Sequence, residues 1–367
     1  MQLPFLSLEP QHAPLRAELT VAFQRVHDSY WYVLGEELRQ FELEYASWSQ
    51  VPHVVGVANG LDALVLALRA LNVGPGDEVI VPANTYIATW LAVTQVGATL
   101  VPVEPDPATS NIDPVAIAAA LTPRTRAIMP VHLYGQACRM PEVMSLASRH
   151  SLLVVEDNAQ AHGAAFGGQL TGSFGHLNAT SFYPGKNLGA LGDGGAVTTA
   201  DAALAQRVRI LRNYGSGQKY HNEEIGYNSR LDELQAALLR VKLPHLAAWT
   251  AQRQQLAAWY HEHLAGIAGL RLPATAPGAT HVYHLYVVHH LRRAALQQHL
   301  AAWGIGTLVH YPVPPYRQPA YQALQLPAGR FPITEELAAT CLSLPLWPGM
   351  KEAQVAAVAS AIRAFEA

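Results

Sequence analysis

Between residue 54 and about residue 200, apolar segments that favour strands alternate with amphipathic segments that favour helices. Seven segments are strand-like: HVVGVANG, EVIVPAN, TLVPVEP, AIMPVHLYG, LLVVEDN, NATSFYP and GGAVTT. Several of them are apolar throughout rather than alternating, which is typical of strands covered on both faces. Helical segments separate most of them, at residues 61–71, 87–96, 114–121, 141–150 and 202–211. This order predicts an α/β fold with parallel βαβ units and helices on both sides of a sheet.

The rhythm changes near Asn228. The residues that follow predict a long helix pair, or one helix broken at Pro244. Beyond them lie a strand candidate, VYHLYVVHH, a helix at 292–303 and a closing helix at 351–365. We therefore expect two domains. The large domain is residues 1–244, starting with a helical segment of about 45 residues, and the small C-terminal α/β domain is residues 245–367.

Composition narrows the class of protein further. Half of the 367 residues are apolar and 14% are charged, which fits a compact interior. The net charge is −3 with mixed signs, so no nucleic-acid partner is expected. Cys138 and Cys341 make no disulfide framework, and we expect a reduced, cytoplasmic setting. The chain start has no basic region followed by an apolar signal core, and no apolar run reaches the about 18 residues of a membrane span, so no membrane partner is expected.

One lysine, Lys186, lies in the turn of NATSFYPGKNLGALGDGGAV, just after a predicted strand. Taken alone, it is a surface lysine in a turn. Asp157 ends the apolar strand of LLVVEDNAQAHGA, where an acidic residue is often only a helix cap. The ends of parallel strands can, however, face one pocket. Pyridoxal 5′-phosphate (PLP) needs such a pair: the amine forms a Schiff base with the aldehyde, and the carboxylate keeps the pyridine nitrogen protonated.

A third segment offers an anion site. GVANGLDALVLALRAL predicts a strand, a turn at Asn59-Gly60 and an amphipathic helix. Free N–H groups at such a helix start can hold a phosphate. Ser181, five residues before Lys186, offers a hydroxyl at a strand end. The same residues also fit an ordinary turn between a strand and a helix.

Together these segments resemble the DegT/DnrJ/EryC1/StrS family of sugar aminotransferases, which are PLP enzymes of fold type I. The resemblance runs from about Pro4 to Pro348 and rests on five segments in order: VPANTYIATWLAV, PVHLYGQ, VVEDNAQAHGA, SFYPGKNLGALGDGGAV and LRNYGSGQKYHNEEIGYNSRLDELQAALLRVKL. It implies a mostly parallel seven-stranded sheet between helices, with a smaller C-terminal α/β domain.

The resemblance also implies roles around the ring of the cofactor. Lys186 matches the Schiff-base lysine, which then acts as the acid and base that moves a proton between substrate and cofactor. Asp157 matches the partner of the pyridine nitrogen. Gln160 matches the residue beside the phenolic oxygen, and Tyr86 the aromatic side chain that stacks on the ring.

On the phosphate, the resemblance places Ser181 and the amides of Gly60 and Leu61. Asn228 matches an asparagine that reaches the phosphate of the other subunit, so a homodimer with shared active sites is implied. The family more often has Ser or Thr where Leu61 stands, which removes one side-chain contact to the phosphate.

Three further positions compare with the family pattern. Asp193 stands for the usual acidic residue of GEGG, and Asn158 replaces a more usual small residue after the key aspartate. Some relatives that dehydrate sugars carry His in place of the lysine. Retention of Lys186 therefore favours transamination over dehydration.

The group within the family that acts at C3 of a nucleotide-linked 3-keto-6-deoxyhexose is the most similar. The implied reaction takes a dTDP-3-keto-6-deoxyhexose and L-glutamate to the dTDP-3-amino-3,6-dideoxyhexose and 2-oxoglutarate. Lys219 and Tyr220 are candidate contacts for the diphosphate or thymine. Tyr183, His310 and Tyr311 are candidate contacts for the hexose, although such tyrosines often only pack and HYPVPPY also fits a rigid loop.

Other interpretations stay open. The amine could go to C4 of a nucleotide-4-keto-6-deoxyhexose or to another ring ketone, or the chain could be a non-catalytic PLP-binding regulator. A nicotinamide dehydrogenase does not fit, because GVANGLD lacks the required glycine spacing. The histidines of HEH (261–263) and HH (289–290) lack metal-ligand spacing, so no metal is expected. His162 either lines the cofactor pocket or has a structural role.

Overall fold

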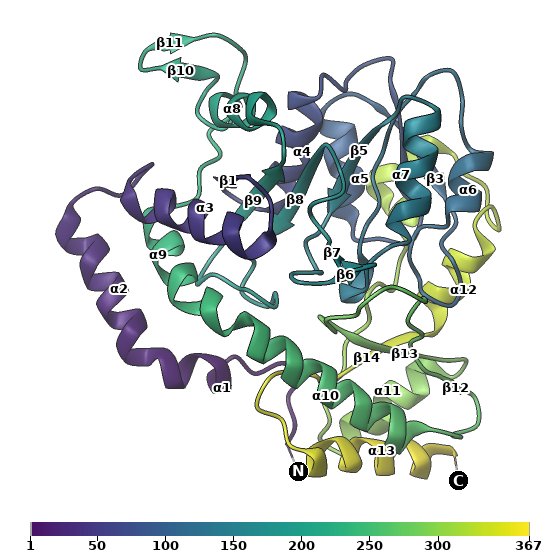
Figure 1. Cartoon of the computed structure of the whole chain (residues 1–367). Helices are drawn as coiled ribbons and strands as arrows, with labels where there is room; N and C mark the ends of the chain where they lie inside the picture. The colour runs from purple at the N-terminus through teal and green to yellow at the C-terminus, as the bar shows by residue number, and fades with distance from the viewer. Residues whose placement is uncertain (1, 367) are drawn as a thin grey trace.

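The computed structural model describes residues 2–366, and its centre is a seven-stranded sheet with the order β1-β9-β8-β5-β4-β2-β3 (Figure 1). Within this sheet β9 runs antiparallel to both of its neighbours, and the other pairs are parallel. The predicted mostly parallel sheet is confirmed. Its strands are β1 (His53–Val57), β2 (Glu78–Pro82), β3 (Thr99–Val103), β4 (Thr125–Ile128), β5 (Leu153–Asp157), β8 (Leu177–Ser181) and β9 (Gly195–Thr199).

Strand β2 explains why the apolar runs are continuous. Val79 and Val81 belong to a core shared with α4 (Gly60–Ala70) and α5 (Ile87–Gln95). Ile80, between them, belongs to a second core with residues of α6 (Pro114–Ala119) and α7 (Met140–Arg149). Because successive side chains point to opposite faces, a strand with a core on each face needs an apolar residue at every position.

The predicted helices form within one or two residues of their expected ends, and α8 (Ala202–Leu211) coincides with its prediction. The predicted break at Pro244 is also found. Helix α9 (Glu233–Lys242) is followed by a short 3₁₀ turn, Leu243–His245, and then by α10 (Leu246–Leu264). Proline has no backbone N–H to continue an α-helical ladder, which accounts for the change at this point.

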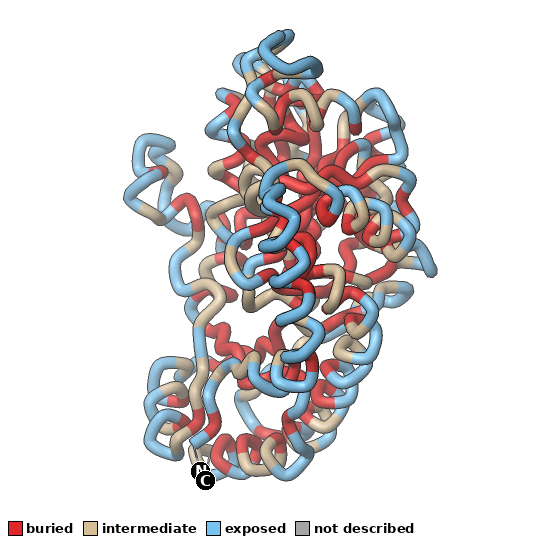
Figure 2. Tube along the Cα trace, turned by 90° about the vertical axis from the view of Figure 1, so that its left-hand side faces the viewer, coloured by how far each residue is buried: buried red, intermediate tan, exposed pale blue. Residues whose placement is uncertain are grey.

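The C-terminal part builds a second, smaller core. An antiparallel sheet of β12 (Leu270–Arg271), β13 (Tyr286–His290) and β14 (Cys341–Leu344) packs with α10, α11 (Arg293–Ala302) and α13 (Glu352–Glu366). Helix α12 (Pro332–Thr340) leads into β14. Figure 2 shows buried residues in the upper body and again in the lower body near the chain ends.

The predicted N-terminal helices are present as α1 (Glu9–His12), α2 (Arg16–Ser29) and α3 (Glu36–Ser49). Leu3, however, pairs with Ile305 and lies in the C-terminal core. The division into residues 1–244 and 245–367 stays a prediction, and the chain start packs on the second part.

Two short hairpins stand outside these cores. Strands β10 (Ser216–Gln218) and β11 (His221–Asn222) project from the body after α8 (Figure 1). Strands β6 (Ala165–Phe166) and β7 (Gln169–Leu170) lie between β5 and β8 in the sequence. Throughout residues 2–366, no helix is both long enough and apolar enough to cross a membrane.

Candidate active site

Lys186 and Asp157 lie at the ends of neighbouring parallel strands. Asp157 is the last residue of β5, which pairs in parallel with β8. Lys186 follows β8 in a loop that closes on itself, because the Ala190 amide donates to the Phe182 carbonyl at 2.7 Å and the Lys186 amide donates to the Tyr183 carbonyl at 2.8 Å. The structure therefore brings the two predicted residues to one edge of the sheet.

The electrostatics of the pair agree with this proximity. Burial raises the pKa of Asp157, while the Thr89 hydroxyl, the Ala159 amide and the Lys186 ammonium act in the opposite direction. Burial lowers the pKa of Lys186 to about 8, and the Asp157 carboxylate opposes that shift. A lysine with this pKa is a far better nucleophile near neutral pH than one in water, because more of its amine is free.

The segment NTYIAT contributes more than the predicted stacking residue. Tyr86 is the N-cap of α5, half of its surface is exposed, and its ring centroid lies 5.2 Å from that of Tyr311. Thr89, one turn later, donates its hydroxyl to Asp157 Oδ2 at 2.8 Å. Thr85 lies 2.9 Å from the Thr89 hydroxyl. The sequence offered no signal for Thr89, since a threonine inside a helix is ordinary.

Gln160 has a fixed orientation. Its Oε1 accepts the Tyr134 backbone N–H at 2.6 Å, and its Nε2 donates to the Tyr311 hydroxyl at 3.0 Å. The Tyr134 hydroxyl in turn donates to the His310 carbonyl. Gln160 therefore keeps one N–H to offer. These contacts bring Gln160, His310 and Tyr311 together with Tyr86.

The start of α4 and the end of β8 form a compact cup. A Cβ at Gly60 would lie 2.6 Å from the Cβ of Ser181, so only glycine fits there. Asn59 caps the helix by accepting the Asp62 amide at 2.9 Å. The earlier amides, those of Gly60 and Leu61, have no partner within the helix and remain available to an anion. The predicted anion site has the required neighbours, and Leu61 adds no hydroxyl to it.

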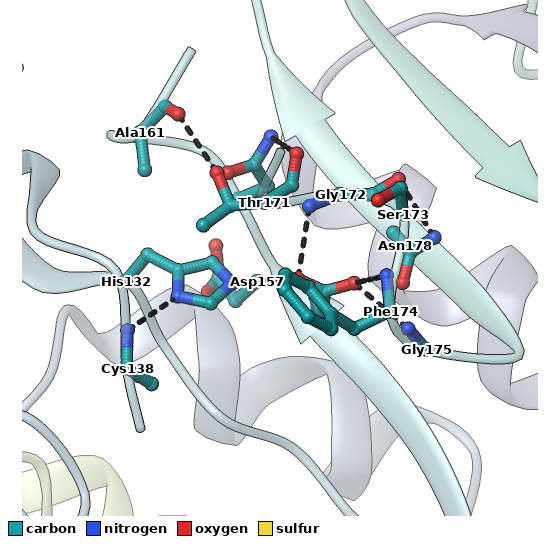
Figure 3. Close-up of polar contacts among 12 residues, drawn as sticks. His132, Cys138, Asp157, Ala161, Thr171, Gly172, Ser173, Phe174, Gly175 and Asn178 are labelled. Atoms are coloured by element: carbon teal, nitrogen blue, oxygen red, sulfur yellow. Dashed lines mark hydrogen bonds and ion pairs between the residues drawn. The ribbon is translucent and has the colours of Figure 1, made fainter. Parts of the chain in front are cut away.

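On the opposite side of β5, Glu156 is held by four donors. The four residues that supply them, His132, Gly172, Phe174 and Gly175, are labelled in Figure 3. The Glu156 carboxylate accepts His132 Nε2–H at 2.7 Å and the amides of Gly172, Phe174 and Gly175 at 2.7–2.9 Å. His132 Nδ1 accepts the Cys138 amide at 3.0 Å, which leaves Nε2 as the nitrogen that donates to Glu156. Sequence reasoning missed this network, although a carboxylate inside an apolar strand was a signal for it.

Three imidazoles near Lys186 are held neutral. Burial, with the Lys186 charge acting in the same direction, lowers the pKa of His162 to about 3 and that of His310 to about 4. The pKa of His284 is lowered for the same reasons. His162 is fully buried, and its Nε2 lies 3.1 Å from the Thr180 hydroxyl. Within residues 2–366, no three histidine, cysteine or acidic side chains are grouped to hold a metal.

The other predicted residues lie elsewhere in the single chain. Lys219 and Tyr220 are exposed at the tip of the β10–β11 hairpin, where the Lys219 Nζ lies 5.1 Å from the Tyr220 ring centroid. Asn228 is exposed and forms an isolated bridge with Asn213. Tyr183, in the loop of Lys186, is also exposed. Among residues 2–366, neither the hairpin nor Asn228 makes a hydrogen bond to Lys186 or Asp157.

Comparisons with known proteins agree with this architecture. The model of the DegT/DnrJ/EryC1/StrS aminotransferase family matches residues 14–363. The chain is 52% identical, over 99% of its length and 96% of the relative's, to dTDP-3-amino-3,4,6-trideoxy-alpha-D-glucose transaminase of Streptomyces venezuelae. It is 49% identical, over 99% of both chains, to dTDP-3-amino-3,6-dideoxy-alpha-D-galactopyranose transaminase of Aneurinibacillus thermoaerophilus.

A solved structure extends the likeness to three dimensions. The crystal structure of S. venezuelae DesV in complex with a ketimine intermediate has a TM-score of 0.98, with 52% identity and coverage of 100% of this chain and 98% of that one. The fold class expected from the resemblance is therefore confirmed. This chain belongs to the DegT/DnrJ/EryC1/StrS aminotransferase family.

Proposed function

We propose that this aminotransferase uses PLP to move the amino group of L-glutamate to C3 of a dTDP-3-keto-6-deoxyhexose. The products are the dTDP-3-amino-3,6-dideoxyhexose and 2-oxoglutarate. The observation that carries the proposal is the convergence of Lys186 and Asp157, each of which shifts the pKa of the other. An amine and a carboxylate facing one site is the arrangement that a pyridoxal ring requires.

The residues present fit this cofactor. Ser181 and the amides of Gly60 and Leu61 form a cup that suits the phosphate of PLP. Because residue 60 is glycine, Ser181 can lie close to these amides. Asp157 would face the pyridine nitrogen and Lys186 the aldehyde. The remaining N–H of Gln160 suits the phenolic oxygen, and the exposed ring of Tyr86 suits a stacking role. When bound, PLP supplies an electron sink for the carbon that loses its proton.

Proton transfer falls to Lys186. With a pKa of about 8, its amine accepts a proton readily and returns it readily at physiological pH. The imidazoles of His162 and His310 do not compete for that proton, since their pKa values lie near 3 and 4. Two hydrogen-bond donors fix the orientation of the Asp157 carboxylate on the other side of the site.

The choice of C3 and of dTDP rests on similarity. The two relatives described above are named for dTDP-linked 3-amino sugars, at 52% and 49% identity. Their sugars differ at C4: the first lacks the hydroxyl there and the second retains it. We propose that Tyr183, His310 and Tyr311 contact the hexose.

We further propose a homodimer with shared sites. Tyr30, Trp31 and Tyr32 form an exposed aromatic segment between α2 and α3, which suits burial against a second copy. In that arrangement Asn228 would reach the phosphate in the neighbouring site, and Lys219 and Tyr220 on the projecting hairpin would contact the nucleotide. Burial by a partner would also explain why these polar groups lie apart from Lys186 in one chain.

The test begins with purified protein and PLP. The wild-type protein is expected to show an absorption band near the visible edge, and Lys186→Ala is expected to lose it. Wild-type protein that stays colourless would contradict the cofactor assignment.

Amination of 3-keto and 4-keto dTDP-hexoses with glutamate, followed by NMR of the product, then identifies the aminated carbon. An amine on C4 would contradict the proposed position. Bound PLP without amino exchange from any amino acid would favour a regulator. Comparing substrates with and without the C4 hydroxyl defines the sugar further.

A further inference from the structure

We propose that Thr89 is a positioning residue that orients the Asp157 carboxylate and keeps it ionised, and that Thr85 sets the direction of the Thr89 hydroxyl. This inference rests on the proposed function, in which Asp157 partners the pyridine nitrogen of PLP. Thr85 and Thr89, at the start of α5, would thereby help to keep the negative charge on Asp157 in the cofactor site.

The geometry gives each oxygen of Asp157 one fixed donor. Thr89 Oγ1 donates to Oδ2 at 2.8 Å, and the Ala159 amide donates to Oδ1 at 3.2 Å. Thr89 is fully buried, and Asp157 is 6% exposed. With one donor on each oxygen, the carboxylate cannot rotate without breaking a buried hydrogen bond, which would leave an unsatisfied polar atom.

The direction of the hydroxyl protons follows from their number. Thr89 has one hydroxyl proton and gives it to Asp157, so the contact of 2.9 Å between Thr85 and Thr89 must use the proton of Thr85. Thr85 is buried as well, at 2% exposure. Hydrogen bonds in such a chain polarise one another, so the Thr85 contact strengthens the bond that reaches the carboxylate.

The Thr89 hydroxyl matters because the Asp157 carboxylate is buried, and burial disfavours its charged form. Burial raises the pKa of Asp157, and the Thr89 hydroxyl is the strongest of the groups that oppose this. The other groups facing the carboxylate are the Ala159 amide, Lys186, His132 and Tyr311. Only an ionised Asp157 can hold a proton on the pyridine nitrogen.

The decisive variant is Thr89→Val, which keeps the shape of the side chain and removes the hydroxyl. Thr89→Ser keeps the hydroxyl. Thr94→Val is the matched control, because Thr94 lies on the same helix, and its hydroxyl contacts the Trp90 carbonyl and the Tyr321 hydroxyl instead. Each variant is loaded with PLP labelled with ¹⁵N in the ring, and NMR follows protonation of that nitrogen across pH.

Thr89→Val should show a smaller protonated fraction of the ring nitrogen at a given pH than the wild type, because less Asp157 is ionised, and should bind PLP about five- to tenfold more weakly. Thr89→Ser and Thr94→Val should match the wild type. Thr85→Val should give a smaller change in the same direction. If Thr89→Val does not fold, Thr85→Val is the variant that tests the inference. A Thr89→Val protein with wild-type protonation and affinity, or a Thr89→Ser protein that behaves like Thr89→Val, would overturn the inference.

The two failures can be told apart. A wild-type protein that shows no visible band with PLP contradicts the proposed function itself. A wild-type protein with the band and a protonated ring nitrogen, accompanied by an unchanged Thr89→Val, contradicts only the role of Thr89.

Discussion

Two neighbouring carboxylates on β5, Glu156 and Asp157, have opposite surroundings. Both are buried, at 0% and 6% exposure. Glu156 accepts four hydrogen bonds, while among residues 2–366 Asp157 accepts two. A carboxylate has about four positions for donors. Glu156 is therefore saturated within the chain, and Asp157 retains capacity for a donor from outside it. Counting donors separates a structural buried acid from one that is available to a ligand.

Glu156, the saturated acid, links the strands at whose edge Asp157, the available acid, lies. Its donors come from His132, after β4, and from Gly172 to Gly175, before β8. Strands β4, β5 and β8 are neighbours in the sheet. Glu156 thus holds together the loops next to β4, β5 and β8. Asp157 is at the end of β5, and Lys186 follows β8.

The largest effect is expected for Asp157→Asn. The side chain keeps its shape but loses the charge that would hold the pyridine nitrogen protonated, so kcat/KM should fall by about 10²- to 10³-fold. Thermal unfolding should change little, because the buried charge is costly to begin with. Steady-state kinetics and calorimetry on the same preparation measure both quantities. Unchanged kinetics would break the contrast between the two acids.

Glu156→Gln should show the reverse pattern. The amide cannot accept all four donors, so buried N–H groups lose their partner, and the free energy of unfolding should fall by about 2–4 kcal/mol. Activity per folded molecule should stay near that of the wild type at low temperature. Denaturant unfolding gives the first quantity. Glu36→Gln, which alters an exposed carboxylate paired with Arg39, is the control and should leave the free energy of unfolding close to that of the wild type.

The pKa of Lys186 gives a sharper test of the same contrast. The amine must be free to react, so labelling of cofactor-free protein by trinitrobenzenesulfonate should rise about tenfold per pH unit and level off near pH 8. Asp157 raises this pKa, so the labelling of Asp157→Asn should level off at a lower pH than that of the wild type. Glu156→Gln should leave it unchanged.

Peptide mapping is essential to that measurement, because burial also lowers the pKa of Lys242 to about 8. Labelling must be read at Lys186 itself. An equal shift in both variants would show that the two acids act alike on the amine.

The sequence predicts the features of this structure that depend on neighbouring residues better than those that depend on residues far apart along the chain. Helix α8 and the ends of β5 and β8 follow from local patterns, and Lys186 and Asp157 follow from those ends. The bond between Thr89 and Asp157 joins residues 68 positions apart, and periodicity does not say which helix faces which strand.

Other features were hidden for related reasons. The four-residue strand β14 is too short to be told from a loop by its apolar run. The placement of β9 between β1 and β8 depends on a crossover, which local pattern does not encode. The roles of Lys219, Tyr220 and Asn228 depend on a second copy, so neither the sequence pattern nor one folded chain tests them.

The smallest effect is expected at Asn158, the next residue along the chain. Its Nδ2 makes one long contact of 3.4 Å with the Thr171 carbonyl, and no donor in residues 2–366 reaches its buried Oδ1. Removing a half-satisfied amide loses little, so Asn158→Ala should change stability by less than about 1 kcal/mol. The pKa of Lys186 and the affinity for PLP should match the wild type. Three consecutive residues would then have different roles. Glu156, with all its acceptor positions filled, stabilises the fold, and Asp157, with acceptor positions free, is available to the cofactor. Asn158 contributes to neither stability nor cofactor binding. A large loss of PLP affinity in Asn158→Ala would instead place that amide in the site and show that donor counting alone is insufficient.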